Sequence, residues 1–590
     1  MKTPQLADLR AELHRLGIYG FLVPRADEHL GEYVSPSAER LAFLTGFTGS
    51  AGLAIVLPDR ACLFVDGRYV QQAADQVGRG QAGQGEWEHR HITDQPPSEW
   101  LAQAASEQPV GYDPWLIGEE QLARFTAAGC RMVALDPNPL DTVWKDRPAP
   151  PSTPVCIQPL ALAGRSSPEK RADIAGALRD AKQDATVITD PASVAWLLNI
   201  RASDVPFTPF ALGFAILHGD AHAELFMTPA RVSAEVRTWL GDAVSVVDRA
   251  GLPDALRALA SRTVRVDPAN SPAWFARALR ESGATVVPGM DPCLLPKARK
   301  NAVEQAGARV AQARDAEAVC RFLCWVEAHG VGQTEQSAAD RLLALRQALP
   351  DFHGESFPAI SAAGEHGAIM HYRADPATDR RIDADELYLI DSGAQFPCGT
   401  TDVTRTVWTG PGVPPDTLRD RYTRVLKGHV AIAQLRFPHG THGAHLDSFA
   451  RQWLWQAGLD FDHGTGHGVG SYLSVHEGPV SLSRLARPVP LEEGMVLSNE
   501  PGFYAPGEFG IRLENLLLVR PFAAGRAFLE FETLTLAPFD RRLIAPGLLL
   551  PHETAWLDAY HRRVAQEVGP KLSPDERAWL DQACRPLAAA

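Results

Sequence analysis

Four acidic residues and one histidine in the last third of the chain restrict the folds that it can adopt. They lie in short segments flanked by Gly or Pro, namely LIDSGAQ, GTTDVTRT, HGTGHGVG, SNEPGFY and GIRLENLLLV, and the residues are Asp391, Asp402, His467, Glu500 and Glu514. Buried carboxylates without a partner are strongly disfavoured, so a fold that gathers four of them needs positive charge between them. Two divalent cations would supply that charge. The set therefore predicts a dinuclear metal site.

The segments around these acids indicate two antiparallel strand pairs. ELYLID and TRTVW are apolar or alternating and are separated by a Gly-containing turn region, so we expect Asp391 and Asp402 side by side on a hairpin. MVLSNEPGFY and GIRLENLLLV form a second pair around residues 505–510 and place Glu500 and Glu514 in the same relation. Strand alternation fixes the direction of each carboxylate. For any acid taken alone, a solvated surface position remains the alternative.

The glycines of HGTGHGVG exclude a helix, so His463 and His467 are expected on extended or looped backbone, facing the same side. A phosphate-binding loop is the competing interpretation, but neither a Lys-Ser/Thr pair nor a helical pattern follows. Further candidates for functional roles are His371 in GAIMHY, His476 in SVHEGP, and Arg512, which precedes Glu514 by two residues and shares its strand face.

The predicted ligands are rich in oxygen and include one imidazole and no thiolate. Such a set favours Mn²⁺, or Co²⁺ in the test tube, over a structural zinc ion. Two cations about 3.5–4 Å apart could hold a shared hydroxide between them. The HExxH pattern of helix-borne zinc proteases is absent from the sequence.

At 590 residues the chain is too long for one core, and we expect three domains. The proline-rich segment RPAPPSTPV (147–155) predicts a linker, and a second break falls near LLPKARKN. The expected domains are residues 1–150, 151–299 and 300–590. The first two repeat the order helix, strand, helix and apolar strand pair, which favours α/β sandwiches with mixed sheets. The third reads as α+β, with helices covering a curved antiparallel sheet.

The formal charge of −14 argues against nucleic acid or an anionic membrane as the main partner. The eight cysteines are scattered without a CxxC pair, as in a reduced cytosolic protein. The N-terminal segment LADLRAELHRLG predicts a helix rather than a signal peptide, and no apolar stretch approaches the length of a membrane span. We therefore expect a cytoplasmic protein.

Taken in this order, the motifs resemble those of the pita-bread metallopeptidases, and within that group those of aminopeptidase P (Xaa-Pro aminopeptidase) of the long, three-domain type. The resemblance rests on GAIMHY, DSGAQFPCGTTDVTRTVW, the segment from DSFARQ to SVHEGP, SNEPGFY and FGIRLENLLLV, and upstream on GFTGSAGLAIV and FVDGRY. It spans nearly the whole chain. The fold that it implies is two creatinase-N-like α/β domains followed by a pita-bread catalytic domain.

The resemblance implies that two Mn²⁺ ions are bound by Asp391, Asp402, His467, Glu500 and Glu514. It implies that a metal-bridging hydroxide attacks the Xaa-Pro carbonyl, with Glu500 taking and passing the proton. His371, His463 and His476 match histidines that hold the substrate and stabilise the oxyanion, and Arg512 could orient a carboxylate. The implied substrates are peptides with proline in second position, and a homodimer is implied. The alternatives are a prolidase, which cleaves Xaa-Pro dipeptides only, and a pita-bread binding module without catalysis.

Overall fold

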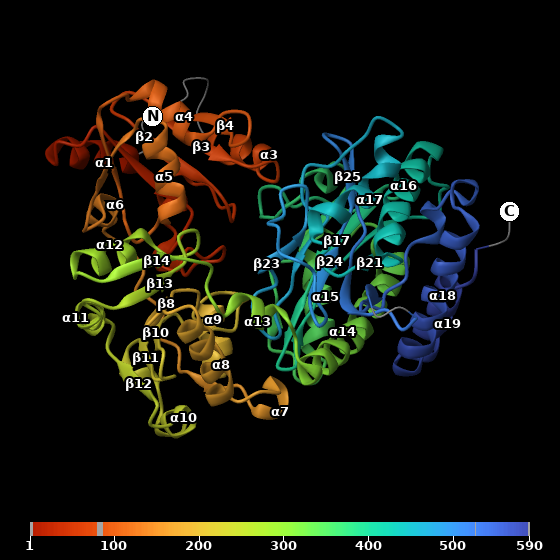
Figure 1. Cartoon of the computed structure of the whole chain (residues 1–590). Coiled ribbons are helices and arrows are strands. Elements are labelled where there is room, and N and C mark those ends of the chain that lie inside the picture. The colour runs from red at the N-terminus through yellow and green to blue at the C-terminus, as the bar shows by residue number, and fades with distance from the viewer. Residues whose placement is uncertain (1–3, 79–86, 525–526, 588–590) are drawn as a thin grey trace. The chain divides into compact units, whose positions relative to one another are not determined.

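The computed structural model describes residues 4–78, 87–524 and 527–587. The chain divides into two compact units, Met1–Leu294 and Leu295–Ala590 (Figure 1). Each unit encloses its own clusters of buried apolar side chains. The boundaries expected from the sequence, at 150/151 and 299/300, are a finer division and stay predictions.

The first unit contains two six-stranded sheets with the same plan, ordered β4-β3-β2-β1-β5-β6 and β12-β11-β10-β8-β13-β14. The strands of the first sheet are β1 (Gly20–Pro24), β2 (Leu53–Val56), β3 (Ala61–Val65), β4 (Glu88–His91), β5 (Pro109–Tyr112) and β6 (Arg131–Ala134). Those of the second are β8 (Ala185–Ile188), β10 (Phe214–His218), β11 (Ala223–Phe226), β12 (Val244–Val247), β13 (Thr263–Val266) and β14 (Thr285–Pro288).

Strand directions also repeat between these two sheets. Both β1 and β8 run antiparallel to one neighbour and parallel to the other. The corresponding outer pairs, β3–β4 and β11–β12, are both parallel. The repeated α/β plan predicted from the sequence is confirmed. Helices cover the sheets, and the main ones are α1 (Pro4–Arg15), α4 (Pro97–Ala104), α5 (Glu119–Ala127), α8 (Ser167–Asp180), α9 (Pro191–Leu198), α10 (Ala234–Leu240), α11 (Leu252–Ala258) and α12 (Ala273–Glu281).

Helix α1 illustrates how the sequence sets these elements. Leu6, Leu9 and Leu13 recur at helical spacing, and all three are buried. Beyond the helix, Gly17 adopts a φ of +69°, which lets the chain reverse into β1. The linker predicted at residues 147–155 contains neither helix nor strand.

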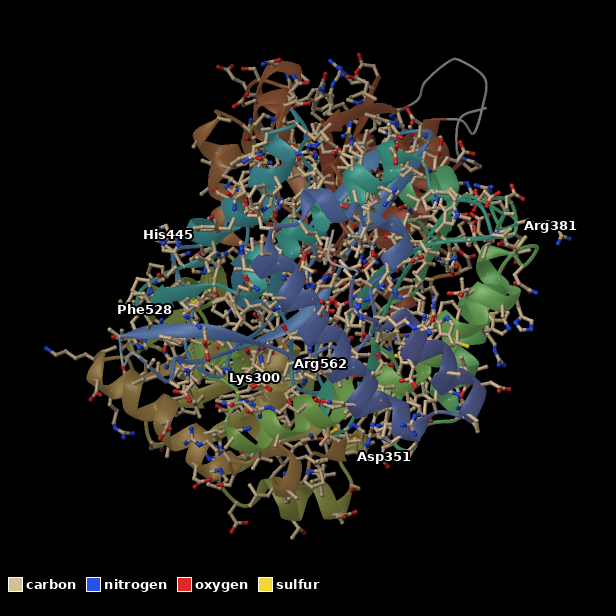
Figure 2. All side chains as sticks on the ribbon, turned by 90° about the vertical axis from the view of Figure 1, so that its right-hand side faces the viewer. Lys300, Asp351, Arg381, His445, Phe528 and Arg562 are labelled. Atoms are coloured by element: carbon tan, nitrogen blue, oxygen red, sulfur yellow. The ribbon has the colours of Figure 1, made fainter. Side chains whose placement is uncertain are left out.

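In the second unit helices surround antiparallel sheets (Figure 1). The helices are α14 (Ala302–His329), α15 (Glu335–Gln347), α16 (Asp416–Ala433), α17 (Gly443–Trp455), α18 (Pro551–Val568) and α19 (Pro574–Ala583). Apolar side chains of α16 and α18 share a core that includes Tyr422, Leu426 and Leu557. On the opposite face of α18, Arg562 is exposed (Figure 2). This amphipathic pattern is the one expected for helices that cover a sheet.

Two sheets of the second unit carry the site, and all their pairings are antiparallel. The three-stranded sheet consists of β16 (Ile360–Ala363), β17 (Leu387–Ser392) and β20 (Val403–Trp408). The six-stranded sheet, ordered β21-β28-β27-β24-β22-β23, consists of β21 (Arg436–Pro438), β22 (Gly466–Gly468), β23 (Glu477–Leu482), β24 (Val496–Asn499), β27 (Asn515–Pro521) and β28 (Phe528–Thr533).

Both predicted strand pairs are confirmed, each with an addition. Between β17 and β20 the chain forms β18 (Ala394–Phe396) and β19 (Gly399–Thr400), which pair with each other. Strand β18 also pairs with β15 (Gly354–Glu355) in this separate small sheet. Between β24 and β27 it forms the hairpin β25 (Gly502–Ala505) and β26 (Phe509–Arg512). No helix within the described ranges is both long and apolar enough to cross a membrane.

Candidate metal centre

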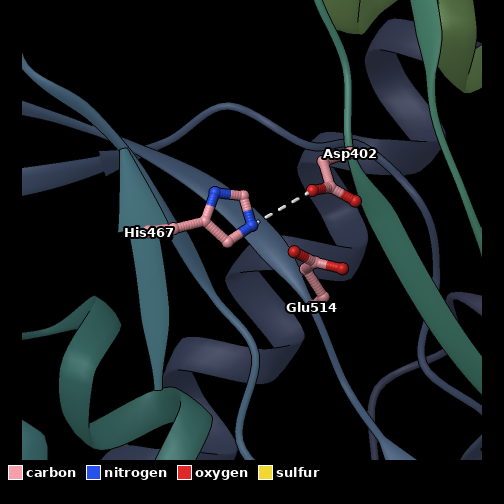
Figure 3. A group of neighbouring side chains, drawn as sticks. All are labelled: Asp402, His467 and Glu514. Carbon is pink, nitrogen blue, oxygen red and sulfur yellow. Dashed lines mark ion pairs between the residues drawn. The ribbon is translucent and has the colours of Figure 1, made fainter. Parts of the chain in front are cut away.

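Three predicted ligands from three separate strand regions meet at one point (Figure 3). Asp402 immediately precedes β20, His467 is the middle residue of β22, and Glu514 immediately precedes β27. One ligand atom from each residue lies within 4.8 Å of the other two. His467 Nε2 is 3.4 Å from Asp402 Oδ2 and 3.5 Å from Glu500 Oε1. A third acid, Glu500, therefore also reaches this point.

The hydrogen bonds of His467 define which ring nitrogen faces the acids. Its Nδ1 lies 3.0 Å from the carbonyl oxygen of Gly468, which can only accept. In the neutral imidazole Nδ1 therefore carries the proton, and Nε2 presents a lone pair to Asp402 and Glu500. A lone pair aimed at two carboxylates is unfavourable unless a cation lies between them. A backbone carbonyl that fixes the tautomer in this way is typical of metal-binding histidines.

Buried carboxylate oxygens provide a second indication of a cation site. Asp391 Oδ1, Asp402 Oδ1 and Glu514 Oε1 are buried and have no hydrogen-bond partner among the described residues. Such oxygens are costly to bury unless they bind something positive. The donor set, oxygen-rich with one imidazole, therefore fits hard or borderline divalent cations.

The same burial and clustering raise the pKa values of two of the acids. Burial, followed by the nearby Asp391 and Glu500, raises the pKa of Asp402 well above its ordinary value. Burial, followed by Asp402, Glu500 and Asp391, raises the pKa of Glu514 in the same way. Without a cation the site therefore favours bound protons, and a cation would displace them.

Close backbone packing explains the glycines on both sides of His467. A Cβ on Gly466 would lie 1.9 Å from the carbonyl oxygen of Ser498, and one on Gly468 would lie 2.2 Å from that of Glu477. Strand β22 can thus approach β24 and β23 only because these two positions lack side chains. The prediction of extended backbone here is confirmed, and the phosphate-loop alternative is wrong for β22.

Arg512, the last residue of β26, connects the acids to one of the predicted histidines. Its Nη2 donates to Asp391 Oδ2 at 2.8 Å, and its Nη1 donates to the Tyr504 hydroxyl at 2.8 Å. That hydroxyl is 2.8 Å from His463 Nε2, while His463 Nδ1 is 2.7 Å from the carbonyl oxygen of Gly464. Since guanidinium only donates and the carbonyl only accepts, Tyr504 donates to Nε2 of the neutral His463.

The other two predicted histidines lie on the segments that border the site. The ring of His476, just before β23, meets that of His467 edge to face with centroids 4.2 Å apart. His371 lies in the turn after the short helix η5 (Gly364–Ala368) and is half-buried. Helix η5 contacts both β25 and β26, so the turn with His371 follows directly on a segment packed against the strand of Arg512.

Sequence reasoning missed three polar residues of the site. Thr404 Oγ1 donates to Glu514 Oε2 at 2.7 Å, and Ser498 Oγ donates to Glu500 Oε1 at 3.1 Å. Tyr504 bridges Arg512 and His463. A signal was available for two of them, because Thr404 and Ser498 each lie two residues from a predicted acid and so share its strand face.

Comparisons with known proteins agree with this fold and site. The model of metallopeptidase family M24 matches residues 306–521, and that of the C-terminal region of this peptidase matches 527–587. Models of the creatinase/prolidase N-terminal domain match residues 5–140 and 146–304. The fold and the site thus define a metallopeptidase with a catalytic domain of the M24 type.

Full-length relatives narrow this class. The chain is 39% identical over 618 residues to a probable Xaa-Pro aminopeptidase P of Aspergillus fumigatus, covering 99% of this chain and 93% of that protein. The corresponding protein of Laccaria bicolor is 38% identical, with 99% and 94% covered. The crystal structure of an X-prolyl aminopeptidase from Caenorhabditis elegans, described as a cytosolic enzyme with a di-nuclear active site, matches with a TM-score of 0.93, 33% identity and full coverage of both chains. This chain belongs to the Xaa-Pro aminopeptidase P family.

A solved Xaa-Pro dipeptidase from Bacillus anthracis matches less of the chain. It covers 64% of this chain and 99% of its own, with a TM-score of 0.52 and 22% identity. That likeness shows a shared fold alone. The full-length matches described above are to Xaa-Pro aminopeptidases, which favours that activity over the prolidase alternative.

Proposed function

We propose that this protein is a metal-dependent Xaa-Pro aminopeptidase that hydrolyses the bond between an N-terminal residue and a penultimate proline. The observation that carries the proposal is the convergence of Asp402, His467 and Glu514, whose ligand atoms lie within 4.8 Å of one another, in a full-length member of this family. A binding module without catalysis would have no need to keep buried, unpartnered carboxylate oxygens at one point.

Asp391, Asp402, His467, Glu500 and Glu514 would hold two divalent cations, which we propose to be Mn²⁺. When bound, such cations polarise the scissile carbonyl and lower the pKa of water, which is the chemistry that an Xaa-Pro bond needs. The Caenorhabditis elegans enzyme is described as having a di-nuclear active site, which supports the number of ions. The oxygen-rich ligands support their identity.

Glu500 is the residue that we propose to take and pass the proton. Its side chain is 18% exposed, against 5% for Asp402, so its carboxylate is open to a substrate or water. The hydroxyl of Ser498 holds Glu500 Oε1 in place. A carboxylate that is both fixed and reachable meets the geometric requirement for a general base.

We propose that His371, His463 and His476 contact the substrate and stabilise the oxyanion, while Arg512 positions Asp391. His463 Nε2 accepts a hydrogen bond from Tyr504 in this structure. A substrate group would therefore compete with Tyr504 for Nε2, or would bind beside it.

Cleavage of matched substrates before and after chelation tests the proposal. Purified protein should cleave Xaa-Pro-Xaa tripeptides, lose activity with a chelator and recover it with Mn²⁺. Turnover of Xaa-Pro dipeptides alone would establish a prolidase instead. His467→Ala should abolish metal-dependent turnover while the fold remains largely intact. Undiminished activity in this variant would contradict the metal-dependent mechanism. Elemental analysis that finds iron or zinc with full activity would refute Mn²⁺.

A homodimer in the cytoplasm is the proposed state of the protein. The cytosolic description of the Caenorhabditis elegans enzyme and the eight free cysteines support a reducing compartment. The net charge of −14 supports peptides rather than nucleic acid or anionic membranes as partners. Sedimentation that yields a 64.0 kDa species would contradict the dimer.

A further inference from the structure

One fully buried carboxylate in the second unit has no place in the proposed chemistry. Glu335 is the first residue of α15 and is 0% exposed. Its Oε1 accepts from the backbone N–H of Ala363 at 2.7 Å and from His366 Nδ1 at 2.9 Å. Its Oε2 accepts from the Tyr372 hydroxyl at 2.8 Å and from the backbone N–H of Arg380 at 3.2 Å. Four donors thus converge on one side chain.

All four donors belong to the single segment 363–380, which begins at the last residue of β16 and runs toward β17. Two more hydrogen bonds involve the backbone of Glu335. Its N–H donates to the Arg380 carbonyl at 3.0 Å, and its carbonyl accepts from Ser361 Oγ at 2.6 Å. The rings of His366 and Tyr372 stack with centroids 4.4 Å apart. Beyond η5 the segment has little regular secondary structure. Its conformation therefore depends on these side-chain bonds.

The segment also lies against the strand that carries Arg512. A Cβ on Gly510 would lie 1.6 Å from the Gly367 carbonyl oxygen, so η5 and β26 are in direct backbone contact. His371 adjoins Tyr372, one of the four donors. Any shift of the Glu335 contacts would consequently move His371 relative to β26.

We propose that Glu335 is a positioning residue that fixes the segment 363–380, and with it His371, against β26. The catalytic consequence rests on the proposed function, in which His371 contacts the substrate. Because a carboxylate only accepts, His366 must present Nδ1–H to it, and the three side chains lock one another in a single arrangement. Replacement of one carboxylate oxygen by an amide NH₂ would set a donor against the donors of this segment.

Glu335→Gln in the full chain tests this proposal with two readouts. Hydrogen–deuterium exchange should become faster in peptides that span residues 363–380, measured without metal or substrate. In the metal-loaded enzyme, KM for an Xaa-Pro-Xaa tripeptide should rise about tenfold or more with a smaller fall in kcat, as for other residues that orient contacting groups. The metal content should remain that of the wild type, because the ligands lie on other elements.

Glu553→Gln is the matched control. Glu553 is also a buried carboxylate in the first turn of a helix, where it accepts from the backbone N–H of Leu550 at 2.7 Å and pairs with Lys427. Its replacement should lower the melting temperature without changing KM or exchange in the segment 363–380. A KM that rises equally in both variants would reduce Glu335 to a general structural role and overturn the proposal.

Tyr372→Phe keeps the proposal testable if Glu335→Gln does not fold. It removes one of the four donors and should give a smaller change of the same kind in exchange and in KM. Unchanged exchange in the segment 363–380 for the variant that folds would overturn the proposal. If the wild type fails to cleave Xaa-Pro peptides, the proposed function falls, and the exchange result alone still decides whether Glu335 fixes the segment.

Discussion

At the scale of single residues, the Tyr504 hydroxyl offers a direct test of whether the hydrogen bonds between Arg512 and His463 matter for catalysis. It accepts from Arg512 and donates to His463, and burial raises the pKa of Tyr504 to about 12, so the donated proton stays in place at neutral pH. Tyr504→Phe should lower kcat/KM by roughly 10–100-fold while the metal content is retained, because its hydroxyl bonds to Arg512 and His463, neither of which is a predicted metal ligand. Steady-state kinetics and elemental analysis on the same sample check this.

Tyr422→Phe provides the control for Tyr504. The Tyr422 side chain is fully buried, and its hydroxyl accepts from the backbone N–H of Asp540 in the core between α16 and α18. Its loss should lower stability and leave kcat/KM unchanged. Equal kcat/KM in wild type and Tyr504→Phe would show that the bridge between Arg512 and His463 has no catalytic role.

His429 makes the second unit sensitive to acid. Burial, reinforced by Arg405, lowers the pKa of His429 to about 3. Its Nδ1 is 3.2 Å from the Leu513 carbonyl and its Nε2 is 3.1 Å from Asn515 Nδ2, so the neutral ring holds both neighbours of Glu514. The unfolded chain gains a proton at this side chain below about pH 6.5, whereas the folded chain does not.

The free energy of unfolding should therefore fall as the pH drops below about 6.5, by about 1.4 kcal/mol per pH unit for His429 alone. Urea unfolding of the metal-loaded protein at several pH values between 7.5 and 5 measures this slope. In His429→Gln the slope should be smaller by about that amount, whereas His552→Gln, at an exposed position of α18, should leave it unchanged. Parallel slopes in the wild type and His429→Gln would contradict the account.

Five candidate metal ligands were predicted from the sequence, and the structure gathers Asp402, His467 and Glu514 at one point. Most of the polar residues that support them were not predicted. Asp391 follows the apolar run LYLI, and Glu514 is flanked by Leu513 and the segment NLLLV, which is unusual for surface acids. The only signal for Thr404 was its spacing of two residues from Asp402. Tyr504 carries no signal, because a hydroxyl at this position is equally suited to a surface strand. Glu335 was not predicted, because an acid in the first turn of a helix is common. Its role follows only from the path of a segment that begins 28 residues later.

At the scale of elements, strand β22 has no room for a side chain at Gly466. Gly466→Ala would place a Cβ 1.9 Å from the Ser498 carbonyl oxygen and force β22 away from β24. His467 would move with the strand, so we expect metal affinity to fall at least tenfold and stability to fall by about 1–3 kcal/mol. Metal titration followed by calorimetry measures both quantities.

The control for Gly466 is Gly547→Ala, where a Cβ would meet nothing within 4 Å and the backbone φ is not positive. This change should alter neither metal affinity nor stability appreciably. Wild-type metal affinity in Gly466→Ala would show that β22 can shift without moving His467. The close packing of Gly466 against the Ser498 carbonyl would then not be needed for metal binding.

Long apolar or periodic segments were predicted well, and short ones were not. The helix α1 and the pairs β17–β20 and β24–β27 follow from clear periodicity in the sequence. The insertions β18–β19 and β25–β26 span only a few residues each, too few to establish a period, and their pairing is set by contacts with distant segments. The predicted hairpins were thus correct in outline and simpler than the structure.

At the scale of the whole molecule, the predicted boundary at 299/300 passes through a buried ion-pair cluster. Lys297 Nζ donates to Glu477 Oε2 at 2.8 Å, and Lys300 Nζ donates to the other oxygen of the same carboxylate. All three side chains are buried, and Glu477 directly follows His476. The division into two compact units at Leu294/Leu295 places all three residues in the second unit. We propose that a functional second unit includes Lys297, since loss of one partner of a buried pair is strongly destabilising.

Metal binding should couple the stability of the whole protein to pH. In the metal-free protein the pKa values of Asp402 and Glu514 lie well above those of the unfolded chain, so the folded state holds protons that the unfolded state has lost. The free energy of unfolding of the metal-free protein should then decrease as the pH rises above about 4, by about 1.4 kcal/mol per pH unit for each group until its folded pKa is passed. Bound cations keep both groups ionised and should remove this loss.

Two measurements check this coupling between metal and protons. Binding of Mn²⁺ to the metal-free protein should release protons, detected by calorimetry in buffers of different ionisation enthalpy, and the affinity should increase with pH. Asp402→Asn should release fewer protons, because one of the two groups with a raised pKa is gone. If the metal-free and metal-loaded proteins lose stability in parallel with pH and no protons are released, these carboxylates do not share a site with the cations. The clustering of their oxygens would then need another explanation, because burial next to one another is favourable for such groups only when positive charge or protons lie between them.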